Sequence, residues 1–290
     1  RLVCLARFSC RRGVRRGLAR KGWNMSGQTS RSEGRFSGKV AIVTGAGRGM
    51  GRAVALLLAR EGAAVAVNSF TAANATAVAE EARLYGAEAI AVPGDVSKSD
   101  EVDRVVEETI SKFGRVDILV NNAGISRTTS PLETISDDDW SEVIDINLKG
   151  VFNFMRAVLP YMKSQRCGKV VNISSSAGRS VSTHAGAHYT ASKAGVLGLT
   201  RHAALEAAAF NININAVTPG TIDTPMMREH FSREFGDAAE EHIAEEARAI
   251  PLGRVGSAED EASLVAFLAS EEASFITGAT IDINGGEFMI

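Results

Sequence analysis

Short apolar runs alternate with longer amphipathic segments along the chain from Lys39 onward. Most of these runs lack polar alternation, as strands do when helices cover both faces of a sheet. Strands separated by helices pair in parallel through right-handed crossovers. The pattern therefore predicts an α/β fold, a doubly wound seven-stranded parallel sheet with helices on both faces. The predicted strands are residues 39–43, 63–68, 88–92, 116–120, 168–173, 212–217 and 279–283.

The loops that follow six of these strands share an unusual composition. They read TGAGRGMG, NSFTA, PGDVS, NNAGIS, SSSAG and TPGTIDTP, rich in Gly, Asn, Ser and Thr. In an open parallel sheet, ligands bind beyond the carboxyl ends of the strands. We therefore expect a ligand cleft along this edge.

The first 24 residues differ from the rest, because they carry eight Arg or Lys and no acidic residue. The remainder holds 24 basic against 34 acidic residues, a formal charge of −10. The basic segment is interpreted as translated upstream sequence before a start at Met25, as an organelle-targeting segment or as a basic binding arm, the first being favoured. Residues 1–38 are assigned to an extension outside the fold, and residues 39–290 to one domain.

Composition argues against several kinds of partner. An acidic domain is a poor match for nucleic acid, and no apolar run approaches the roughly 18 residues of a membrane span. Cys4, Cys10 and Cys167 are too few and scattered for a disulfide framework or paired zinc ligands. We expect a cytoplasmic protein with no metal site.

The glycine-rich turn at residues 44–51 is the first candidate binding element. It follows a buried strand and opens a helix, so Gly45, Gly49 and Gly51 would let backbone amides approach a pyrophosphate. The dinucleotide pattern G-x-G-x-x-G does not fit, because Met50 stands where its third glycine would fall. A structural turn without a ligand remains the alternative.

The end of the second strand bears on the choice of cofactor. No acid lies between Glu61 and Glu80 to bind the ribose diol of NAD. Asn68, Ser69 and Thr71 offer neutral donors, and Arg48 could face a 2′-phosphate or remain a solvated loop cation. NADP(H) is favoured, and NAD(H) stays possible because no Arg or Lys lies at the strand's end.

Tyr189 and Lys193 stand four residues apart, so on a helix they project from one face. A neighbouring ammonium lowers a phenol's pKa toward neutrality, which suits a general acid for a carbonyl oxygen. The SSSAG loop would bring a hydroxyl beside the phenol, and DINLKG places Asn147 on a long helix.

Together these motifs resemble the classical short-chain dehydrogenase/reductase family, over residues 38–289. TGAGRGMG is similar to its TGxxxGxG turn, NNAG to its central-strand motif, YTASK to its YxxxK, and TPGTIDTP to its PGxxxT segment. The resemblance implies a single-domain Rossmann fold and a catalytic tetrad of Asn147, Ser175, Tyr189 and Lys193. Tyr189 would transfer the proton, Ser175 would orient the substrate oxygen, Lys193 would bond the nicotinamide ribose, and Asn147 would hold a water.

The same resemblance adds contacts to the adenine, the central cleft and the carboxamide. With the residues named above, the expected cofactor-binding set is Gly45, Arg48, Gly49, Met50, Gly51, Asn68, Ser69, Thr71, Asp95, Val96, Asn122, Ala123, Gly124, Tyr189, Lys193, Pro219, Gly220, Ile222 and Thr224.

One departure leaves the catalytic hydroxyl open, because the spacing to Tyr189 is one residue longer than the family's and Ser176 stays an alternative to Ser175. The surplus residue falls in the loop that holds His184 and His188. Both are interpreted as packed or solvated, with substrate contact as the other possibility.

The expected activity is NADP(H)-dependent interconversion of a ketone and a secondary alcohol. The family branch suggests a 3-oxoacyl thioester as substrate, with a sugar, polyol or cyclic diol as the alternative and a non-catalytic cofactor-binding regulator as a third. Residues 225–250 are expected to form a substrate lid. By family habit the chain should form a homotetramer through the helices of Asn147 and Tyr189.

Overall fold

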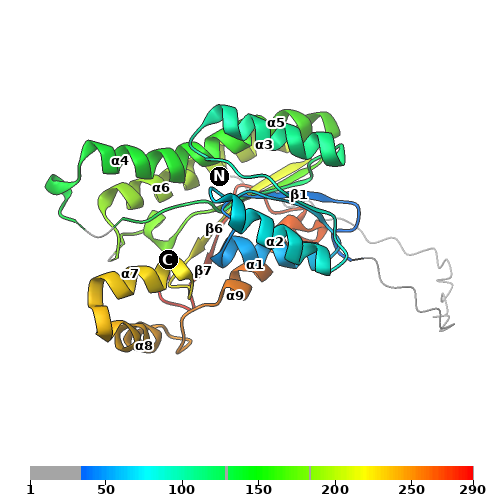
Figure 1. Ribbon diagram of the computed structural model, residues 1–290. Helices are drawn as coiled ribbons and strands as arrows, with labels where there is room; N and C mark the ends of the chain where they lie inside the picture. The colour runs from blue at the N-terminus through cyan, green and yellow to red at the C-terminus, as the bar shows by residue number, and fades with distance from the viewer. Residues whose placement is uncertain (1–33, 128–129, 183, 290) are drawn as a thin grey trace, which may run out of the picture. The chain divides into compact units, whose positions relative to one another are not determined.

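The computed structural model describes residues 34–127, 130–182 and 184–289. Seven strands form one sheet in the order β3-β2-β1-β4-β5-β6-β7, and every neighbouring pair is parallel (Figure 1). This order reverses direction between β1 and β4, which is the place where a doubly wound sheet opens a ligand crevice. The predicted fold is confirmed. The strands are β1 Val40–Val43, β2 Ala64–Val67, β3 Ala89–Ala91, β4 Ile118–Asn121, β5 Gly168–Ile173, β6 Ile212–Pro219 and β7 Thr280–Ile283.

Two apolar cores lie on opposite faces of the sheet. One joins the sheet to α1 (Gly49–Arg60), α2 (Ala72–Leu84) and α9 (Ala258–Ala269). The other joins it to α3 (Ser99–Phe113), α5 (Gly150–Gln165) and α6 (Ala187–Ala207). Along β1, side chains alternate between these cores, with Ala41 and Val43 in the first and Ile42 in the second. Strands buried on both faces have no polar side, which explains their near-continuous apolar sequence.

Asn147 lies in a break within a long helical segment. The helix α4 (Asp137–Ile144) continues through one π-helical turn, Asp145–Lys149, into α5. Ser136 caps the start of α4, because its hydroxyl accepts a hydrogen bond from the backbone N–H of Asp139. The π-helical turn places the Asn147 side chain in the interior, where it is fully buried.

The predicted lid segment forms a pair of helices that follow β6 (Figure 1). They are α7 (Pro225–Phe235) and α8 (Ala239–Ala249), joined by the short turn Gly236–Ala238. Thr224 caps α7 by accepting a hydrogen bond from Met227, and Pro225 occupies the first helical position, which needs no N–H donor.

The folded domain begins slightly earlier than residue 39. Phe36 is 1% exposed and belongs to the first core, and its N–H donates to the Glu61 carbonyl at 2.8 Å. Phe36 therefore packs against the first core although it precedes the first strand pattern, because burial of one aromatic ring is not visible as a strand or helix pattern. The interpretations of residues 1–24 lie outside the described residues. Within the described part of the chain, no helix is both long and apolar enough to cross a membrane.

Candidate active site

The glycine turn after β1 is held against the end of β4. Thr44 Oγ1 accepts hydrogen bonds from the backbone N–H groups of Asn122 and Ala123, both at 3.0 Å. Gly45 has φ +61°, and a Cβ there would lie 2.8 Å from the Ala123 Cα. At Gly51 a Cβ would lie 2.6 Å from the Gly45 carbonyl oxygen. These approaches exclude any side chain at Gly45 and Gly51, so the backbone itself forms the floor of the turn.

Beside this turn lies a cleft of about 890 Å³ at the carboxyl edge of the sheet. The first turn of α1 contains no acidic side chain, and no side chain caps its amino end, so its N–H groups can bind a phosphate. Thirteen of the predicted cofactor-binding residues line this cleft: Gly45, Arg48, Gly49, Met50, Asn68, Ser69, Thr71, Asp95, Val96, Asn122, Ala123, Gly124 and Thr224.

The other predicted contacts do not line the cleft. Gly51 is buried beneath the turn, Ile222 pairs with Gly256 in an isolated bridge, and a Cβ at Gly220 would meet Glu287. Several further residues line the cleft and were not predicted from the sequence. They lie close to the predicted motifs, and the curvature of the loops, rather than the residue type, brings them to the cleft. These lining residues are Gly47, Phe70, Asn74, Gly94, Ser97, Lys98, Ile125, Glu142, Asp145, Ile146, Pro225 and Met226.

One end of the cleft lies where β2 and β3 end. Asn68 is fully buried, and its Nδ2 donates to the carbonyls of Val92 and Gly94 at 3.0 and 3.3 Å. Its Oδ1 is buried and has no hydrogen-bond partner among the described residues. A Cβ at Gly47 would lie 2.5 Å from Ser69 Oγ, so a side chain at position 47 would clash and glycine fits best there. The residues present fit a nicotinamide dinucleotide.

Arg48 pairs with Glu229 of α7, and the longer of its two hydrogen bonds joins Nη2 to Oε2 at 3.3 Å. Both side chains are about half exposed. The guanidinium predicted to face a phosphate therefore lies at the cleft but is engaged with the lid segment.

Lys193 lies on α6 and is buried near the end of β5. Its Nζ donates to the Ile173 carbonyl at 3.0 Å, while its own carbonyl accepts from Ser174 Oγ at 2.8 Å. Burial lowers the pKa of the Lys193 ammonium to about 8, and the nearby Glu261 carboxylate offsets part of this effect. The ammonium is 5.7 Å from the centre of the Tyr189 ring.

The Tyr189 phenol lies close to the Ser175 side chain, which follows β5 and caps the short helical turn Ser176–Gly178. Burial raises the pKa of Tyr189, and the nearby Ser175 hydroxyl lowers it by less. The expectation that Lys193 lowers this pKa is not met, because its Nζ is directed to the Ile173 carbonyl. The same geometry favours Ser175 over Ser176 as the hydroxyl beside the phenol.

Glu261 on α9 is a buried acid whose charge affects the pKa of Lys193, and sequence reasoning missed it. It is 0% exposed, and neither carboxylate oxygen has a hydrogen-bond partner among the described residues. Burial raises its pKa to about 8, while the Lys193 ammonium lowers it by a smaller amount. The acidic run around it, AEDEA, reads as the solvated first turn of a helix, so the sequence gives no sign of this burial.

The family model described as enoyl-(acyl carrier protein) reductase matches residues 45–287. A 3-oxoacyl-[acyl-carrier-protein] reductase of Staphylococcus epidermidis is 45% identical over 252 residues, which cover 87% of this chain and 99% of that protein. The chain belongs to the short-chain dehydrogenase/reductase family.

Two solved structures of short-chain dehydrogenases/reductases match the fold closely. Levodione reductase superposes with a TM-score of 0.84 at 35% identity, covering 87% of this chain and 98% of that one. A 3-oxoacyl-[acyl-carrier protein] reductase with bound NAD from Brucella melitensis gives a TM-score of 0.79 at 33% identity, covering 88% and 95%. As a short-chain dehydrogenase/reductase, this chain is an oxidoreductase of carbonyl and CH–OH groups that uses a nicotinamide cofactor.

Proposed function

We propose that this enzyme reduces a 3-oxoacyl thioester to the 3-hydroxyacyl thioester with NADPH. The observation that carries the reaction class is that the side chains of Ser175, Tyr189 and the buried Lys193 lie together beyond the end of β5. The substrate class rests on the 3-oxoacyl reductases that match almost over their whole length. In these assignments Asn147, Ser175, Tyr189 and Lys193 form the catalytic tetrad.

The mechanism follows from where each polar group lies. Ser175 and Tyr189 present two hydroxyls to the substrate carbonyl oxygen, and Tyr189 gives it a proton as negative charge develops there. When bound, the nicotinamide supplies a hydride to the carbonyl carbon. Lys193 would bond the nicotinamide ribose, as the family resemblance implies, with its ammonium 5.7 Å from the centre of the Tyr189 ring. Burial raises the pKa of the Tyr189 phenol and so keeps it protonated before the reaction.

Preference for NADPH is supported by the residues at the end of β2. Asn68, Ser69 and Thr71 line the cleft there without an acidic neighbour that would repel a 2′-phosphate. Arg48 on the glycine turn lines the cleft, and its guanidinium would leave Glu229 and bind the 2′-phosphate instead. NAD(H) is the competing choice, since a similar reductase was solved with bound NAD.

A cyclic ketone or diol is the second candidate substrate, favoured by the structural similarity to levodione reductase. The helices α7 and α8 would then enclose a compact ring rather than admit an acyl chain. The third candidate function is a cofactor-binding regulator that does not catalyse a reaction. The presence of both Tyr189 and Lys193 argues against it. In each case residues 225–250 serve as the substrate lid.

We also propose a cytoplasmic homotetramer. An apolar groove of about 590 Å³ runs between the π-helical turn, α5 and α6, lined by Leu148, Phe152 and Leu199. Phe152 is 44% exposed and Leu205 on α6 is 78% exposed. Large exposed apolar side chains on two long helices suit a contact between subunits. Light scattering that gives a monomer at micromolar concentration would contradict this assembly.

The deciding experiment measures NADPH and NADH oxidation by the purified protein with 3-oxoacyl thioesters, cyclic diketones and keto sugars. The reverse reactions use the matching alcohols. A kcat/KM at least tenfold higher for a thioester with NADPH supports the proposal. Turnover confined to diketones or sugars would replace the substrate, and absence of any turnover with a folded, cofactor-binding protein would favour the regulator.

A further inference from the structure

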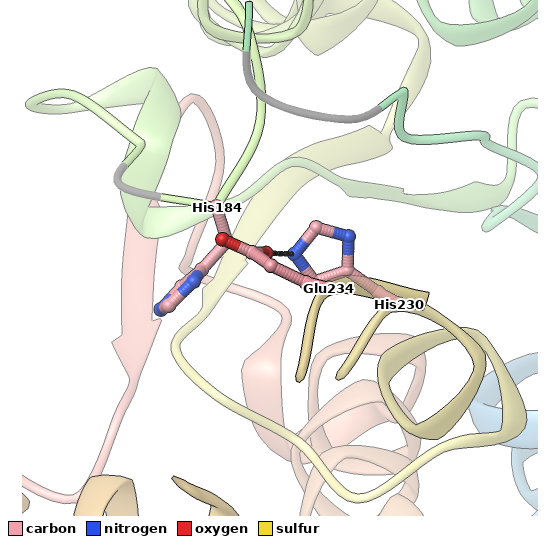
Figure 2. Close-up of side chains that lie close together, drawn as sticks. All are labelled: His184, His230 and Glu234. Atoms are coloured by element: carbon pink, nitrogen blue, oxygen red, sulfur yellow. Dashed lines mark ion pairs between the residues drawn. The ribbon is translucent and has the colours of Figure 1, made fainter. Parts of the chain in front are cut away.

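Three chemically reactive side chains meet outside the tetrad, between the loop before α6 and the lid. His184 lies in that loop, and His230 and Glu234 lie on α7 (Figure 2). One candidate ligand atom from each lies within 4.8 Å of the other two. We propose that His184, His230 and Glu234 bind one Zn²⁺ ion, which ties the lid to the loop that precedes Tyr189.

The spacing on α7 brings two of the ligands together. His230 and Glu234 are four residues apart, so their side chains lie on one face of the helix. His230 Nε2 lies 2.8 Å from Glu234 Oε2, and Figure 2 shows both directed toward His184. The third ligand comes from a segment 46 residues earlier, which is why sequence spacing predicted no metal site.

His230 lies in a protected place beside a carboxylate. Its side chain is 8% exposed, and Nε2 lies 2.8 Å from Glu234 Oε2. Two side chains that can bind a metal are therefore already held together next to His184. Burial also lowers the pKa of His230, which favours the neutral imidazole that a metal requires.

The surroundings fit a fixed site rather than a loose surface cluster. The His184 ring centre lies 5.5 Å from that of Phe231 and 5.9 Å from that of His230. Phe231 is 2% exposed and forms an apolar wall behind both imidazoles. Glu246 of α8 brings a further carboxylate, with Oε1 3.3 Å from His184 Nε2, so both lid helices reach the cluster.

The donor set identifies the metal class. Two imidazole nitrogens and one carboxylate oxygen suit Zn²⁺, with water or Glu246 in a fourth position, and they suit Mg²⁺ or Ca²⁺ poorly. Closing the cluster around Zn²⁺ needs ligand bonds of about 2.0–2.2 Å, which requires modest side-chain movement. Residues at the start of α7, Pro225 and Met226, line the cofactor cleft, so a tied lid would slow its opening.

The test is isothermal titration of the full chain, stripped with EDTA, with Zn²⁺, together with visible absorption of the Co²⁺ form. One ion per site and tetrahedral Co²⁺ bands are expected. Glu234→Gln, a partly exposed position, and His230→Gln should each weaken binding at least tenfold. The matched control is His202→Gln, because His202 and Glu206 form the same helical pair at 3.0 Å on α6. This control should bind as the parent does.

Two results would overturn the site. One is that Glu234→Gln, as stable as the parent, binds Zn²⁺ as tightly as the parent does. The other is that neither Glu234→Gln nor His230→Gln differs from the parent in Zn²⁺ binding. Thiol sites elsewhere in the chain are common to all four proteins and cancel in this comparison. The effect on turnover rests on the proposed function: Zn²⁺ should lower kcat severalfold in the parent and in His202→Gln but not in Glu234→Gln. If the proposed activity is wrong, the binding experiment still decides the site.

Discussion

Asn147 and Ile125 are joined by two hydrogen bonds that run in opposite directions. The Asn147 Oδ1 accepts from the Ile125 N–H at 2.8 Å, and its Nδ2 donates to the Ile125 carbonyl at 2.9 Å. Nδ2 also lies 3.2 Å from Ser192 Oγ on α6. The side-chain amide therefore completes the backbone pairing of the cleft loop after β4, in addition to any role in holding water.

Replacing Asn147 with Ala should damage both stability and turnover. It leaves the Ile125 N–H and carbonyl without partners, which costs roughly 2–4 kcal/mol of unfolding free energy. Asn215 provides a matched control, because it is equally buried and pairs both ways with backbone, at Ile276 and Ala279. Chemical denaturation should show similar losses for both Ala variants. Only Asn147→Ala should lower kcat by more than tenfold, and equal kinetic effects would contradict a specific role.

Tyr189→Phe should abolish turnover and spare cofactor binding, since it removes only the proton donor. Loss of a general acid lowers kcat by about 10² to 10⁴. The control is Tyr161→Phe on α5, at a half-exposed position away from the cleft. Stopped-flow turnover and fluorescence titration with NADPH measure the two effects separately. Retained turnover in Tyr189→Phe would show that the mechanism is wrong.

Arg48 and Glu229 give a test of cofactor choice. Arg48→Gln should raise the KM for NADPH about tenfold, roughly 1.4 kcal/mol, and change the KM for NADH little. Glu229→Gln frees the guanidinium and should lower the KM for NADPH. Arg52→Gln is the control, because Arg52 pairs with Glu81 outside the cleft lining. If Arg48→Gln changed the KM for NADPH and the KM for NADH equally, Arg48 would not bind the 2′-phosphate.

Glu261 predicts a pH dependence of stability. Its pKa is about 8 in the folded chain and 4.5 as the ordinary value, so between these values the folded state binds the extra proton. Stability should therefore fall as pH rises from about 5 to 8, by on the order of 3 kcal/mol. Lys193, with its pKa lowered to about 8, acts oppositely only above that pH.

Urea denaturation at pH 5 to 8 measures this slope. Glu261→Gln should flatten it and stabilise the protein most at pH 8, while the exposed Glu259→Gln should keep the parent's slope. An unchanged slope in Glu261→Gln would mean that the carboxylate is solvated in solution.

Local pattern predicted the sheet well, because strands covered on both faces leave a clear apolar signature. The ends of the strands were predicted less accurately. The fourth strand was expected to start at Val116, but β4 starts at Ile118. Val116 instead pairs with the Gln165 side chain, and Asp117 accepts from the Val40 N–H at 3.0 Å. These contacts join residues 49 and 77 positions apart, which no local pattern encodes.

In the candidate site, too, residues set by a local pattern were predicted and contacts between distant segments were not. Motif residues such as Gly45 and Asn122 were found because each follows a recognisable strand. The burial of Glu261, the Arg48–Glu229 pair and the approach of His184 to His230 depend on how helices pack over the sheet. Whether the predicted residues act in catalysis and cofactor binding stays a prediction.

The π-helical turn at Asp145–Lys149 has a consequence for insertions and deletions. It holds one residue more than an α-helical turn would need, so a single deletion there would leave an unbroken helix. Because each residue of an α-helix adds about 100° of rotation, that deletion would turn α4 and α5 relative to each other. Asn147 and the apolar face of α5 could then no longer both face inward. Chain length, and not only residue identity, fixes the active site at this point.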